Sequence, residues 1–502
     1  MLFMPSTDTS TIFLDTHHHV GPIDRRIFGG FLEHLGRAVY EGVYDPTSGL
    51  SDVNGYRRDV LHALQKLNMP VMRYPGGNFV SCYDWTDGIG PRDQRPVRRD
   101  FAWRSIESNQ FGTDEFMAWC KLARTEPMMA VNLGTAGAKE ASALVEYCNL
   151  PAGSAWSDRR VSNGHADPYG VKLWCLGNEM DGPWQAGHVP ADEYARRANA
   201  ASVMMKGMDP TIQTIACGSS GRTMGTYLSY DRVVLEHCWD KIDFISAHRY
   251  SNNDRADTAW FLAEGVEIDR VIDDYAGVIG YVRGLKRSDK QIHVSFDEWN
   301  VWYKDRGMDG HWKQAPHLLE EVYNFEDALV CAQYLSSFIR RADLVKVACI
   351  AQVVNVIAPV LTRNNALLLQ SIYYPFLLYS QATAGVSLRT AVTCPIYRAG
   401  ARGEVPALDV SASFNPTDGS ASVFIVNRDA DDTVTVRYDD RIVDRVVSVE
   451  VMSGVDPKAS NTWEKPDAVR PTKGHADLVD GAVVMNVPGP GLVVLRLLTR
   501  AR

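Results

Sequence analysis

The feature that most constrains this chain is a repeated alternation between about residue 24 and residue 355, in which a short apolar run is followed by a helix-like stretch. Each apolar run is as long as a buried strand and ends in polar residues. Eight such runs occur, at residues 26–34, 70–77, 127–134, 171–179, 211–220, 243–250, 291–300 and 346–355. Strands that alternate with helices pair in parallel through crossover connections, and eight of these units favour closure into a (β/α)₈ TIM barrel. An open doubly wound sheet is the alternative fold.

Two of the intervening helices are visible as patterns. After Asp192, which we expect to act as a cap, apolar residues recur at helical spacing over 194–205, and Gly207 ends the run. A second helix is predicted over 324–345, just before the eighth strand.

From about residue 385 the pattern changes to an alternation of period two, as in TVTVRYD at 433–439. Further runs of this kind are separated by Asp, Gly and Pro turns, which together predict an antiparallel β-sandwich. The early run at 9–16 is expected to complete that sandwich as an extra strand. The predicted domains are therefore an N-terminal strand at 1–20, the α/β barrel at 21–384 and the C-terminal β-sandwich at 385–502.

Charge and cysteine content narrow the classes of partner and compartment. The net charge of −9 repels phosphate backbones, so nucleic acid is not an expected partner. The first residues show no signal-peptide pattern, and no apolar span is long enough for a bilayer, so we expect a cytoplasmic protein without a membrane partner. The nine cysteines stand singly without a CxxC pair, as is usual for buried thiols in a reducing compartment.

Polar side chains stand at the ends of the predicted strands. In a parallel barrel these ends form the active face, so the side chains are expected to point into one shared cup. The residues are Glu33, Asn78, Asn178, Glu179, His248, Tyr250, Glu298, Gln352 and Asn355. A carboxylate at such a buried position is costly unless it is hydrogen-bonded or used.

Glu179 and Glu298 suggest a specific chemistry. Two carboxyls that face each other across a cup are what the cleavage of a glycosidic bond requires, because one donates a proton to the leaving oxygen and the other meets the positive charge that develops at the sugar carbon. In a retaining enzyme the two groups lie roughly 5 to 5.5 Å apart, and the charge of one then keeps the other protonated near neutral pH.

Each of these residues also has a structural interpretation. A single Glu after an apolar run is most often a cap or a surface residue, and His248 taken alone is more often a core histidine than a ligand. The HHH at 17–19 is expected to be a solvated strand end, and the GG at 76–77 a tight turn rather than a phosphate loop. No spacing resembles a metal motif. Trp103 and Trp302 are candidates for stacking on a sugar ring.

With these residues the chain resembles the α-L-arabinofuranosidases of glycoside hydrolase family 51 over nearly its whole length. The stretches that carry the resemblance are FLEHLGRAVYEG (31–42), RYPGGNFVSCYDWTDGIGP (73–91), NQFGTDEFM (109–117), WCLGNEMDGPWQ (174–185), DEWNVWY (297–303) and AQVVNVIAP (351–359). The chain departs from the family's pattern at Cys82, where we expect Gly, and around His248.

The resemblance implies a (β/α)₈ barrel with a C-terminal β-sandwich and a retaining exo-acting enzyme, with Glu179 as acid/base and Glu298 as nucleophile. It implies that Glu33, Asn78 and Asn178 bind furanose hydroxyls, that Tyr250 and Gln352 orient the nucleophile or the sugar, that His248 supports the site, and that Arg73 holds the nucleophile ionised. It also implies an oligosaccharide substrate from arabinan or arabinoxylan, no cofactor or metal, and a homo-oligomer, trimer or hexamer.

Two alternatives stay open from the sequence. Another retaining glycosidase on the same scaffold, such as an endoglucanase or a β-xylosidase, would use the same two carboxyls, since the fold does not fix the substrate. A carbohydrate-binding protein without turnover is a different class, and the retention of both Glu179 and Glu298 argues against it.

Overall fold

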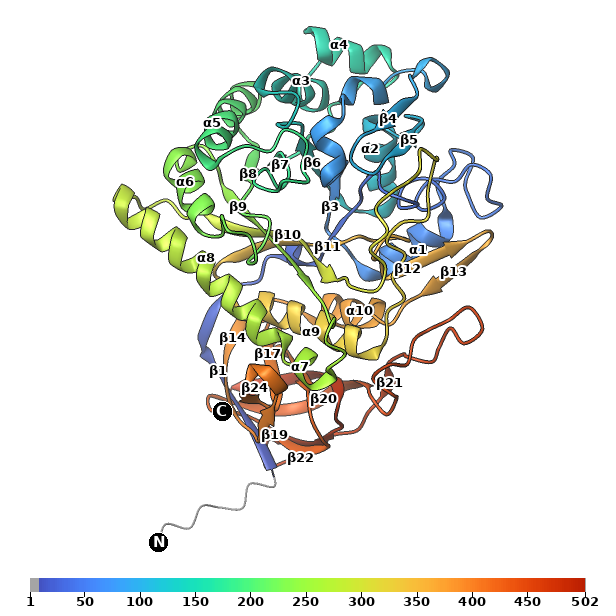
Figure 1. The fold of residues 1–502 in the computed structure, drawn as a ribbon. Coiled ribbons are helices and arrows are strands. Elements are labelled where there is room, and N and C mark those ends of the chain that lie inside the picture. Colours follow the sequence, from blue (N-terminus) through green and yellow to red (C-terminus); the bar gives the residue numbers. More distant parts are fainter. Residues whose placement is uncertain (1–8, 502) are drawn as a thin grey trace.

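The computed structural model describes residues 9–501 and consists of a barrel joined to a curved sheet (Figure 1). Eight parallel strands close into a ring in the order β10-β11-β2-β3-β6-β7-β8-β9. They are β2 (Gly29–Phe31), β3 (Val71–Tyr74), β6 (Glu126–Val131), β7 (Leu173–Leu176), β8 (Gln213–Ala216), β9 (Phe244–Ser251), β10 (His293–Val301) and β11 (Val345–Ala351). Each lies within one of the eight predicted runs or overlaps it closely. The closed barrel is confirmed, and the open sheet is wrong because β9 pairs with β10.

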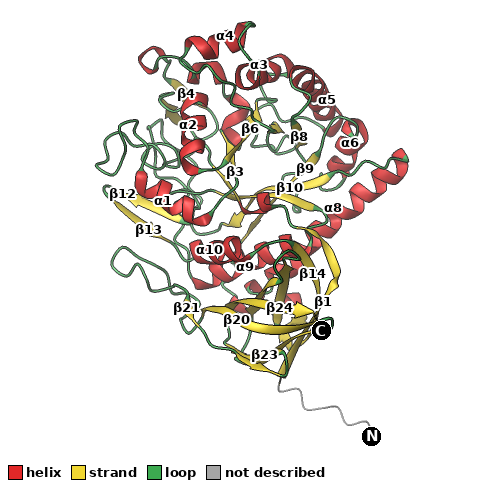
Figure 2. Cartoon of the chain, turned by 180° about the vertical axis from the view of Figure 1, so that it is seen from behind, coloured by secondary structure: helices red, strands yellow, loops and turns green. Residues whose placement is uncertain are grey.

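The barrel strands are apolar because both of their faces are covered. Every residue of β3 and of β7 is buried, since helices pack on the outside of the ring and the side chains of the other strands fill its interior. Figure 2 shows these helices arranged around the strands. A run that is apolar at every position, rather than at alternate positions, is therefore the expected sequence of such a strand.

The helices are α1 (Arg58–Leu67), α2 (Thr113–Ala123), α3 (Ala138–Asn149), α4 (Ala155–Ser162), α5 (Ala191–Met208), α6 (Ser229–Cys238), α7 (Thr258–Phe261), α8 (Glu264–Lys286), α9 (Phe325–Arg340) and α10 (Tyr373–Ala382). Both predicted helices are confirmed, but the predicted cap of α5 is wrong. Pro190 is its N-cap residue, and Asp192 lies inside the first turn, where a carboxylate favours the helix dipole. In α9, Asn324 and Asp327 cap each other's backbone N–H groups.

The C-terminal part is a single ten-stranded sheet in the order β21-β20-β24-β18-β17-β14-β1-β19-β23-β22. Its strands are β1 (Thr9–Pro22), β14 (Val386–Thr393), β17 (Leu408–Phe414), β18 (Ser420–Asn427), β19 (Asp432–Tyr438), β20 (Arg441–Met452), β21 (Thr472–Lys473), β22 (Asp477–Val479), β23 (Ala482–Val487) and β24 (Gly491–Ala501). All pairs are antiparallel except the parallel pair of β1 and β19. The predicted period-two alternation is present in β19, where Val434, Val436 and Tyr438 are buried.

The N-terminal strand belongs to this sheet rather than to the barrel. β1 lies between β14 and β19, and Figure 1 shows it, in blue, among the orange strands of the C-terminal part. The first eight residues of the predicted 1–20 segment lie outside the described residues. Three short hairpins form separate two-stranded sheets. They are β4 (Arg98–Asp100) with β5 (Ser105–Glu107), β12 (Val360–Arg363) with β13 (Ala366–Leu369), and β15 (Ile396–Arg398) with β16 (Glu404–Pro406).

Helix α9 joins the barrel to the sheet. It is buried along nearly its whole length between the two parts (Figure 1). At its end, Arg340 pairs with Asp409 of β17 at 2.6 Å and with Asp269 of α8 at 2.8 Å. The sheet is therefore held to the barrel by apolar packing and by a partly buried set of charges.

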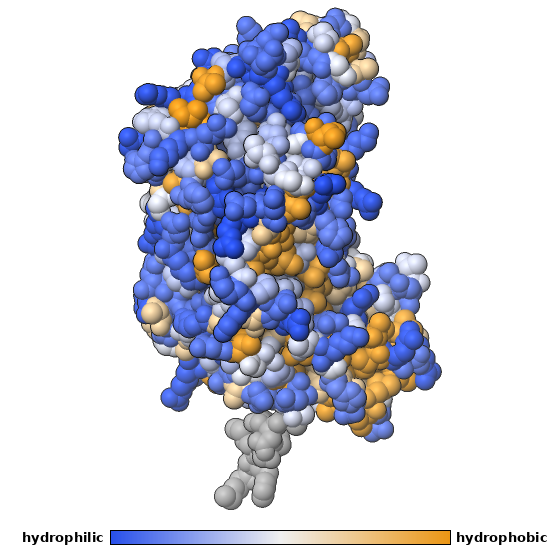
Figure 3. All heavy atoms as spheres, turned by 90° about the vertical axis from the view of Figure 1, so that its right-hand side faces the viewer, coloured by the Kyte–Doolittle hydropathy of each residue, from blue (hydrophilic) through white to orange (hydrophobic). Residues whose placement is uncertain are grey.

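The face of the molecule seen in Figure 3 is mostly hydrophilic, and its apolar residues gather in a few patches. Among residues 9–501, no helix combines the length and the apolar character that crossing a bilayer requires.

Candidate active site

A cavity of about 470 Å³ opens at the C-terminal ends of the barrel strands. Nine of the eleven predicted site residues line it: Glu33, Asn78, Trp103, Glu179, His248, Tyr250, Glu298, Trp302 and Gln352. Asn178 and Arg73 are fully buried behind it. The strand ends thus bring together residues that lie more than 300 positions apart in the sequence.

Glu179 reaches this cavity through a sharp turn after β7. Gly177 has a φ of 88°, and Glu179 itself has a φ of 43°, a left-handed conformation that is uncommon for a residue with a side chain. Its Oε1 lies 2.9 Å from Nδ1 of His248, and its Oε2 accepts a hydrogen bond of 2.6 Å from Nε1 of Trp184. Both carboxyl oxygens therefore face nitrogen atoms.

Glu298 lies on β10 and is held by two donors. Nη1 of Arg73 donates to its Oε1 at 2.7 Å, and the hydroxyl of Tyr250 donates to its Oε2 at 2.9 Å. Both oxygens of this carboxyl therefore accept a hydrogen bond, one of them from a cation. These donors suit a nucleophile that attacks as a carboxylate.

Glu179 and Glu298 face each other across the cavity. An oxygen of one lies within 4.8 Å of an oxygen of the other, and both lie within the same distance of a ring nitrogen of His248. This upper limit lies below the roughly 6.5 to 9.5 Å of inverting glycosidases, and it agrees with retaining ones, whose carboxyl groups lie about 5 to 5.5 Å apart. The geometry suits direct attack by one carboxyl on the sugar carbon.

His248 stands between the two glutamates as a cation. Its Nδ1 lies 2.9 Å from Glu179 and 3.6 Å from Glu298, and its Nε2 lies 3.4 Å from Oδ1 of Asp297. Burial alone would lower the pKa of His248, but Glu298, Asp297 and Glu179 outweigh it and raise that pKa to about 10. Sequence reasoning considered two carboxyls only, whereas the structure shows a positive charge shared between them.

The surroundings move the pKa values of Glu179 and Asp297 in opposite directions. Burial raises the pKa of Glu179, and Glu298 adds to the rise, while the hydrogen bond with His248 works against both. For Asp297, burial would raise the pKa, but Arg73 and His248 lower it, so this carboxyl is ionised. The site thus contains one carboxyl, Glu179, that favours its protonated form and another, Asp297, that favours its ionised form.

Asn178 and Arg73 form the floor behind the glutamates. Nη2 of Arg73 donates to Oδ1 of Asn178 at 2.8 Å, and Nδ2 of Asn178 donates to Gln185 at 3.2 Å. Nδ2 of Asn178 also lies 3.5 Å from Oδ1 of Asn78. Asn78 is the first residue of a short 3₁₀ turn, η2 (Asn78–Cys82), and lines the cavity wall. One chain of hydrogen bonds therefore runs from the Glu298 carboxyl to the wall.

Glu33 forms the opposite side of the cavity. Its Oε1 accepts hydrogen bonds from the backbone N–H of Phe79 at 2.9 Å and from Nε1 of Trp103 at 3.0 Å, while Gln352 lies 3.4 Å from its Oε2. Burial raises the pKa of Glu33 to about 8; the Phe79 N–H opposes the rise and Glu298 adds to it. Glu33 is therefore largely neutral at pH 7 and presents a polar wall without a second negative charge.

The two glycines at 76–77 have a role that the sequence did not reveal. A Cβ atom built on Gly77 would lie 2.4 Å from Oε2 of Glu33 and 2.7 Å from its Cδ, so only a glycine leaves room for the carboxyl. The pair was predicted to be a tight turn, and in the structure it leaves space for a site residue.

Trp302 lines the cavity beside Tyr250, with the ring centroids 5.5 Å apart in an edge-to-face arrangement, and its Nε1 donates to the backbone oxygen of Asp305. Asn355, another predicted strand-end residue, does not line the cavity. Its amide instead bonds Thr362 and the backbone oxygen of Arg37, and so it holds the loop that follows β11.

Two residues of the site were missed by sequence reasoning. Asp297 is followed by Glu298, and strict alternation along a strand would place the two on opposite faces. The pairing of β10 with β9 shifts register between Ser295 and Glu298, and this irregularity lets both carboxyls join the site. Trp184 was not among the predicted site residues, but it is 48% exposed at the cavity rim and bonds Glu179.

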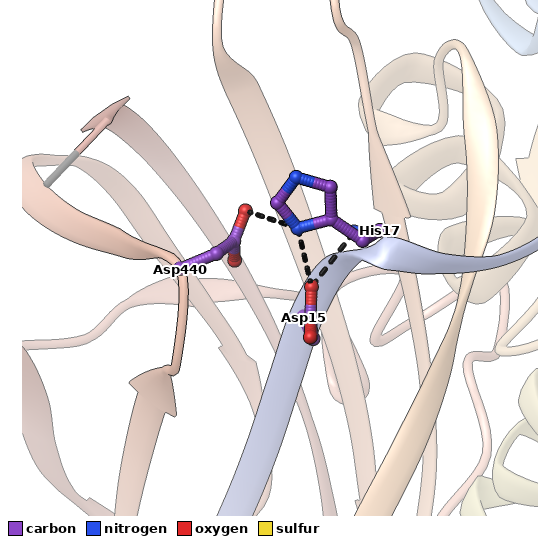
Figure 4. Close-up of side chains that lie close together, drawn as sticks. All are labelled: Asp15, His17 and Asp440. Atoms are coloured by element: carbon purple, nitrogen blue, oxygen red, sulfur yellow. Dashed lines mark hydrogen bonds and ion pairs between the residues drawn. The ribbon is translucent and has the colours of Figure 1, made fainter.

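Two groups of side chains within residues 9–501 have the composition of a metal site. One is Glu179, His248 and Glu298 itself, where a protonated imidazole has no lone pair to offer a cation. The other is Asp15, His17 and Asp440 on the C-terminal sheet (Figure 4), where Nδ1 of His17 lies 3.0 Å from Asp15 and 3.6 Å from Asp440. The His17 side chain is 78% exposed, so its predicted solvation is confirmed, but residues 17–19 lie within β1 and not at a strand end. This group lies outside the cavity.

A parallel barrel whose strand ends carry two facing carboxyls at this distance defines a retaining glycoside hydrolase. The comparisons with known proteins agree. The family described as α-L-arabinofuranosidase C-terminal domain matches residues 297–489, and the family described as α-L-arabinofuranosidase 1 domain matches residues 63–265.

A relative from Halalkalibacterium halodurans, named an intracellular exo-α-(1→5)-L-arabinofuranosidase, is 43% identical and covers 98% of this chain and 99% of its own. A relative from Bifidobacterium longum, named an exo-α-(1→6)-L-arabinofuranosidase, is 40% identical over 92% of this chain and 91% of its own. The solved structure of a family 51 α-L-arabinofuranosidase from Bifidobacterium longum has a TM-score of 0.94 and 36% identity, and covers 98% of this chain and all of its own. The chain belongs to the α-L-arabinofuranosidases of glycoside hydrolase family 51.

Proposed function

We propose that this enzyme removes terminal non-reducing α-L-arabinofuranosyl residues from arabinan or arabinoxylan oligosaccharides by double displacement. The observation that carries the proposal is the pair of glutamates within 4.8 Å of each other in a cavity at the strand ends. The names of the relatives supply the sugar, and the geometry supplies the mechanism.

In the first step Glu298 attacks the anomeric carbon while Glu179 gives its proton to the departing glycosidic oxygen. The sugar is then held as an ester of Glu298, and Glu179 is ionised. In the second step Glu179 takes a proton from a water molecule that attacks the same carbon, the ester bond breaks, and both carboxyls return to their starting states. Arg73 and Tyr250 stabilise the Glu298 carboxylate at the start and the end of this cycle.

The remaining predicted residues have roles in binding under this proposal. Glu33 and Asn78 hydrogen-bond the furanose hydroxyls, Gln352 orients the sugar, and Trp103 and Trp302 form its apolar walls. Asn178 was predicted to bind hydroxyls too, but it lies buried behind the cavity, where it holds Asn78 and Arg73 in place. A neutral Glu33 can donate as well as accept, which suits a hydroxyl that does both.

The type of glycosidic linkage that the enzyme cleaves is a separate question from the reaction mechanism. Relatives of nearly equal identity carry names with (1→5) and (1→6) linkages, so we infer that the loops around the leaving group set the linkage and the two carboxyls do not. The relatives named intracellular support a cytoplasmic enzyme. A trimer or hexamer stays a prediction.

A pair of substitutions tests the assignment of roles. Glu298→Ala should abolish turnover on every substrate, while Glu179→Ala should still release an activated phenol and be rescued by azide. An equal loss on good and poor leaving groups in Glu179→Ala would refute the acid role. Parallel assays with aryl arabinofuranoside, aryl xyloside and cellulose separate the proposal from a β-xylosidase or an endoglucanase.

A further inference from the structure

We propose that Trp184 is a positioning residue that favours the ionised form of Glu179, and that the contact between its indole and Glu179 weakens when that carboxyl takes up a proton. The inference rests on the proposed role of Glu179 as the acid/base. It concerns the hydrogen bond that joins the two side chains at the rim of the cavity.

The argument starts from the donors around the Glu179 carboxyl. Nδ1 of His248 lies 2.9 Å from Oε1, and Nε1 of Trp184 lies 2.6 Å from Oε2. An indole nitrogen can only donate, and a cationic imidazole can only donate from either nitrogen. The arrangement therefore suits a carboxylate best, because a protonated Oε2 can accept from the indole only through its remaining lone pair and carries no charge to strengthen the bond.

The two donors, His248 and Trp184, differ in how easily they can move away from Glu179. His248 is 6% exposed, lies on β9 and is held from behind by Asp297. Trp184 is 48% exposed and stands in the loop after β7. Because His248 is fixed, the oxygen that faces Trp184 is the one that can carry the proton. Protonation of Glu179 thus weakens the contact with Trp184, whose exposed ring is free to turn outward.

The loop also shows how Trp184 is brought to this place. The backbone N–H of Gly182 donates to the carbonyl oxygen of Glu179 at 2.8 Å, so the chain folds back on itself. The indole lies against Gly182, where an added Cβ would come within 2.6 Å of its ring. A Cβ at this position would displace the ring, so Gly182 leaves the space in which the indole nitrogen reaches the carboxyl.

Other ionisable groups face Glu179 from the surrounding elements. They are His248 and Tyr250 on β9, Glu298 on β10, Glu33 after β2 and Arg222 after β8, with Arg73 and Asp297 behind them. Arg222 is paired with Glu267 at 2.5 Å. All of these except Arg222 are buried or held within the site, which leaves Trp184 as the exposed partner of Glu179 among the contacts described.

The contact between Trp184 and Glu179 belongs to one interval of the reaction cycle. Glu179 is ionised after it has given its proton to the leaving oxygen and until it takes a proton from the attacking water. During that interval the indole N–H holds the carboxylate in the orientation of a base. Trp184 keeps its own proton throughout and exchanges none with Glu179.

The test compares pH profiles of kcat/KM for wild type, Trp184→Phe and Trp302→Phe on an aryl arabinofuranoside. Trp184→Phe keeps an aromatic ring and removes the N–H that favours the ionised form, so the basic limb should move up by about 0.5 to 1 pH unit. Trp302→Phe removes a matched N–H of the same cavity that bonds Asp305 instead, so its basic limb should stay with wild type. Gly182→Ala displaces the indole without changing it and should move the limb in the same direction as Trp184→Phe.

Tryptophan emission provides a second measurement that needs no turnover. Because Trp103 bonds Glu33, which also titrates, the emission is followed in a Glu33→Gln background. There it should change in a step at the pH of the basic limb, and adding either Trp184→Phe or Glu179→Gln should abolish that step. A basic limb in Trp184→Phe that coincides with wild type, an equal shift in Trp302→Phe, or an emission step that persists in Trp184→Phe would each overturn the inference. A failure of the proposed function can be told apart from a failure of this inference. If Glu179 were not the acid, the Glu179→Gln enzyme would keep the wild-type basic limb and would keep its activity on substrates with poor leaving groups.

Discussion

Glu33 provides a quantitative test of the electrostatics of this site through stability. Its carboxyl is buried, its pKa is raised to about 8, and the ordinary value of the group is 4.5. Between these two pH values the folded protein carries a proton on Glu33 that the unfolded chain has lost. Unfolding therefore releases a proton, and rising pH favours the unfolded state until pH 8.

The magnitude follows from the width of that window. Each unit of pKa difference corresponds to about 1.4 kcal/mol, so Glu33 should cost the folded state about 4 kcal/mol between pH 5 and pH 8. Glu33→Gln removes this titration. For a chain of 502 residues the unfolding entropy is roughly 1 kcal/mol per degree, so Tm of the variant minus Tm of wild type should rise by about 4 °C over the window.

The assay is thermal unfolding of both proteins at one scan rate between pH 5 and pH 9. Asp100→Asn is a matched control, because burial raises the pKa of Asp100 to about 6 only. Its Tm difference from wild type should stop changing above pH 6, while that of Glu33→Gln continues to grow until pH 8. A Tm difference for Glu33→Gln that is constant from pH 5 to pH 9 would refute the reasoning.

Three further outcomes are expected. Tyr250→Phe keeps the ring but removes a hydrogen bond to the Glu298 carboxylate, which is worth about 1.5 to 3 kcal/mol, so kcat/KM should fall about 10-fold or more; a value within twofold of wild type contradicts this role. Arg73→Met leaves Asp297 and Glu298 without the buried guanidinium and with His248 as their remaining cation, so the protein should lose on the order of 3 to 5 kcal/mol of stability, seen as a lower urea midpoint; an unchanged midpoint contradicts it. Dialysis against a chelator should leave kcat/KM unchanged, because every proposed step uses carboxyls, and a loss restored by a divalent cation would show otherwise.

Much of the barrel and its site was predictable because the strands are buried on both faces and end at one rim. The eight apolar runs identified the strands, and the polar residues at the ends of six of them identified most of the cavity wall. His248 and Tyr250 also follow from simple alternation, since residues two apart on β9 point to the same side.

The parts that the sequence did not predict depend on irregular backbone and on long-range pairing. Asp297 enters the site through a shift of register in β10, which no alternation pattern indicates. Trp184 returns to Glu179 through a turn that depends on the space left by Gly182. The parallel pairing of β1 with β19 joins residues more than 400 positions apart, and local patterns carry no information about such a choice of neighbour.

The central claim is that one sugar is passed through Glu298 while Glu179 supplies and recovers the proton. The most direct measurement is mass spectrometry of the enzyme quenched during turnover of an activated aryl arabinofuranoside, with Glu179→Ala used to slow the second step. The account predicts an arabinofuranosyl ester on the peptide that contains Glu298, more abundant in Glu179→Ala than in wild type. An ester on a different residue, or turnover of Glu179→Ala with no ester at any time, would contradict it.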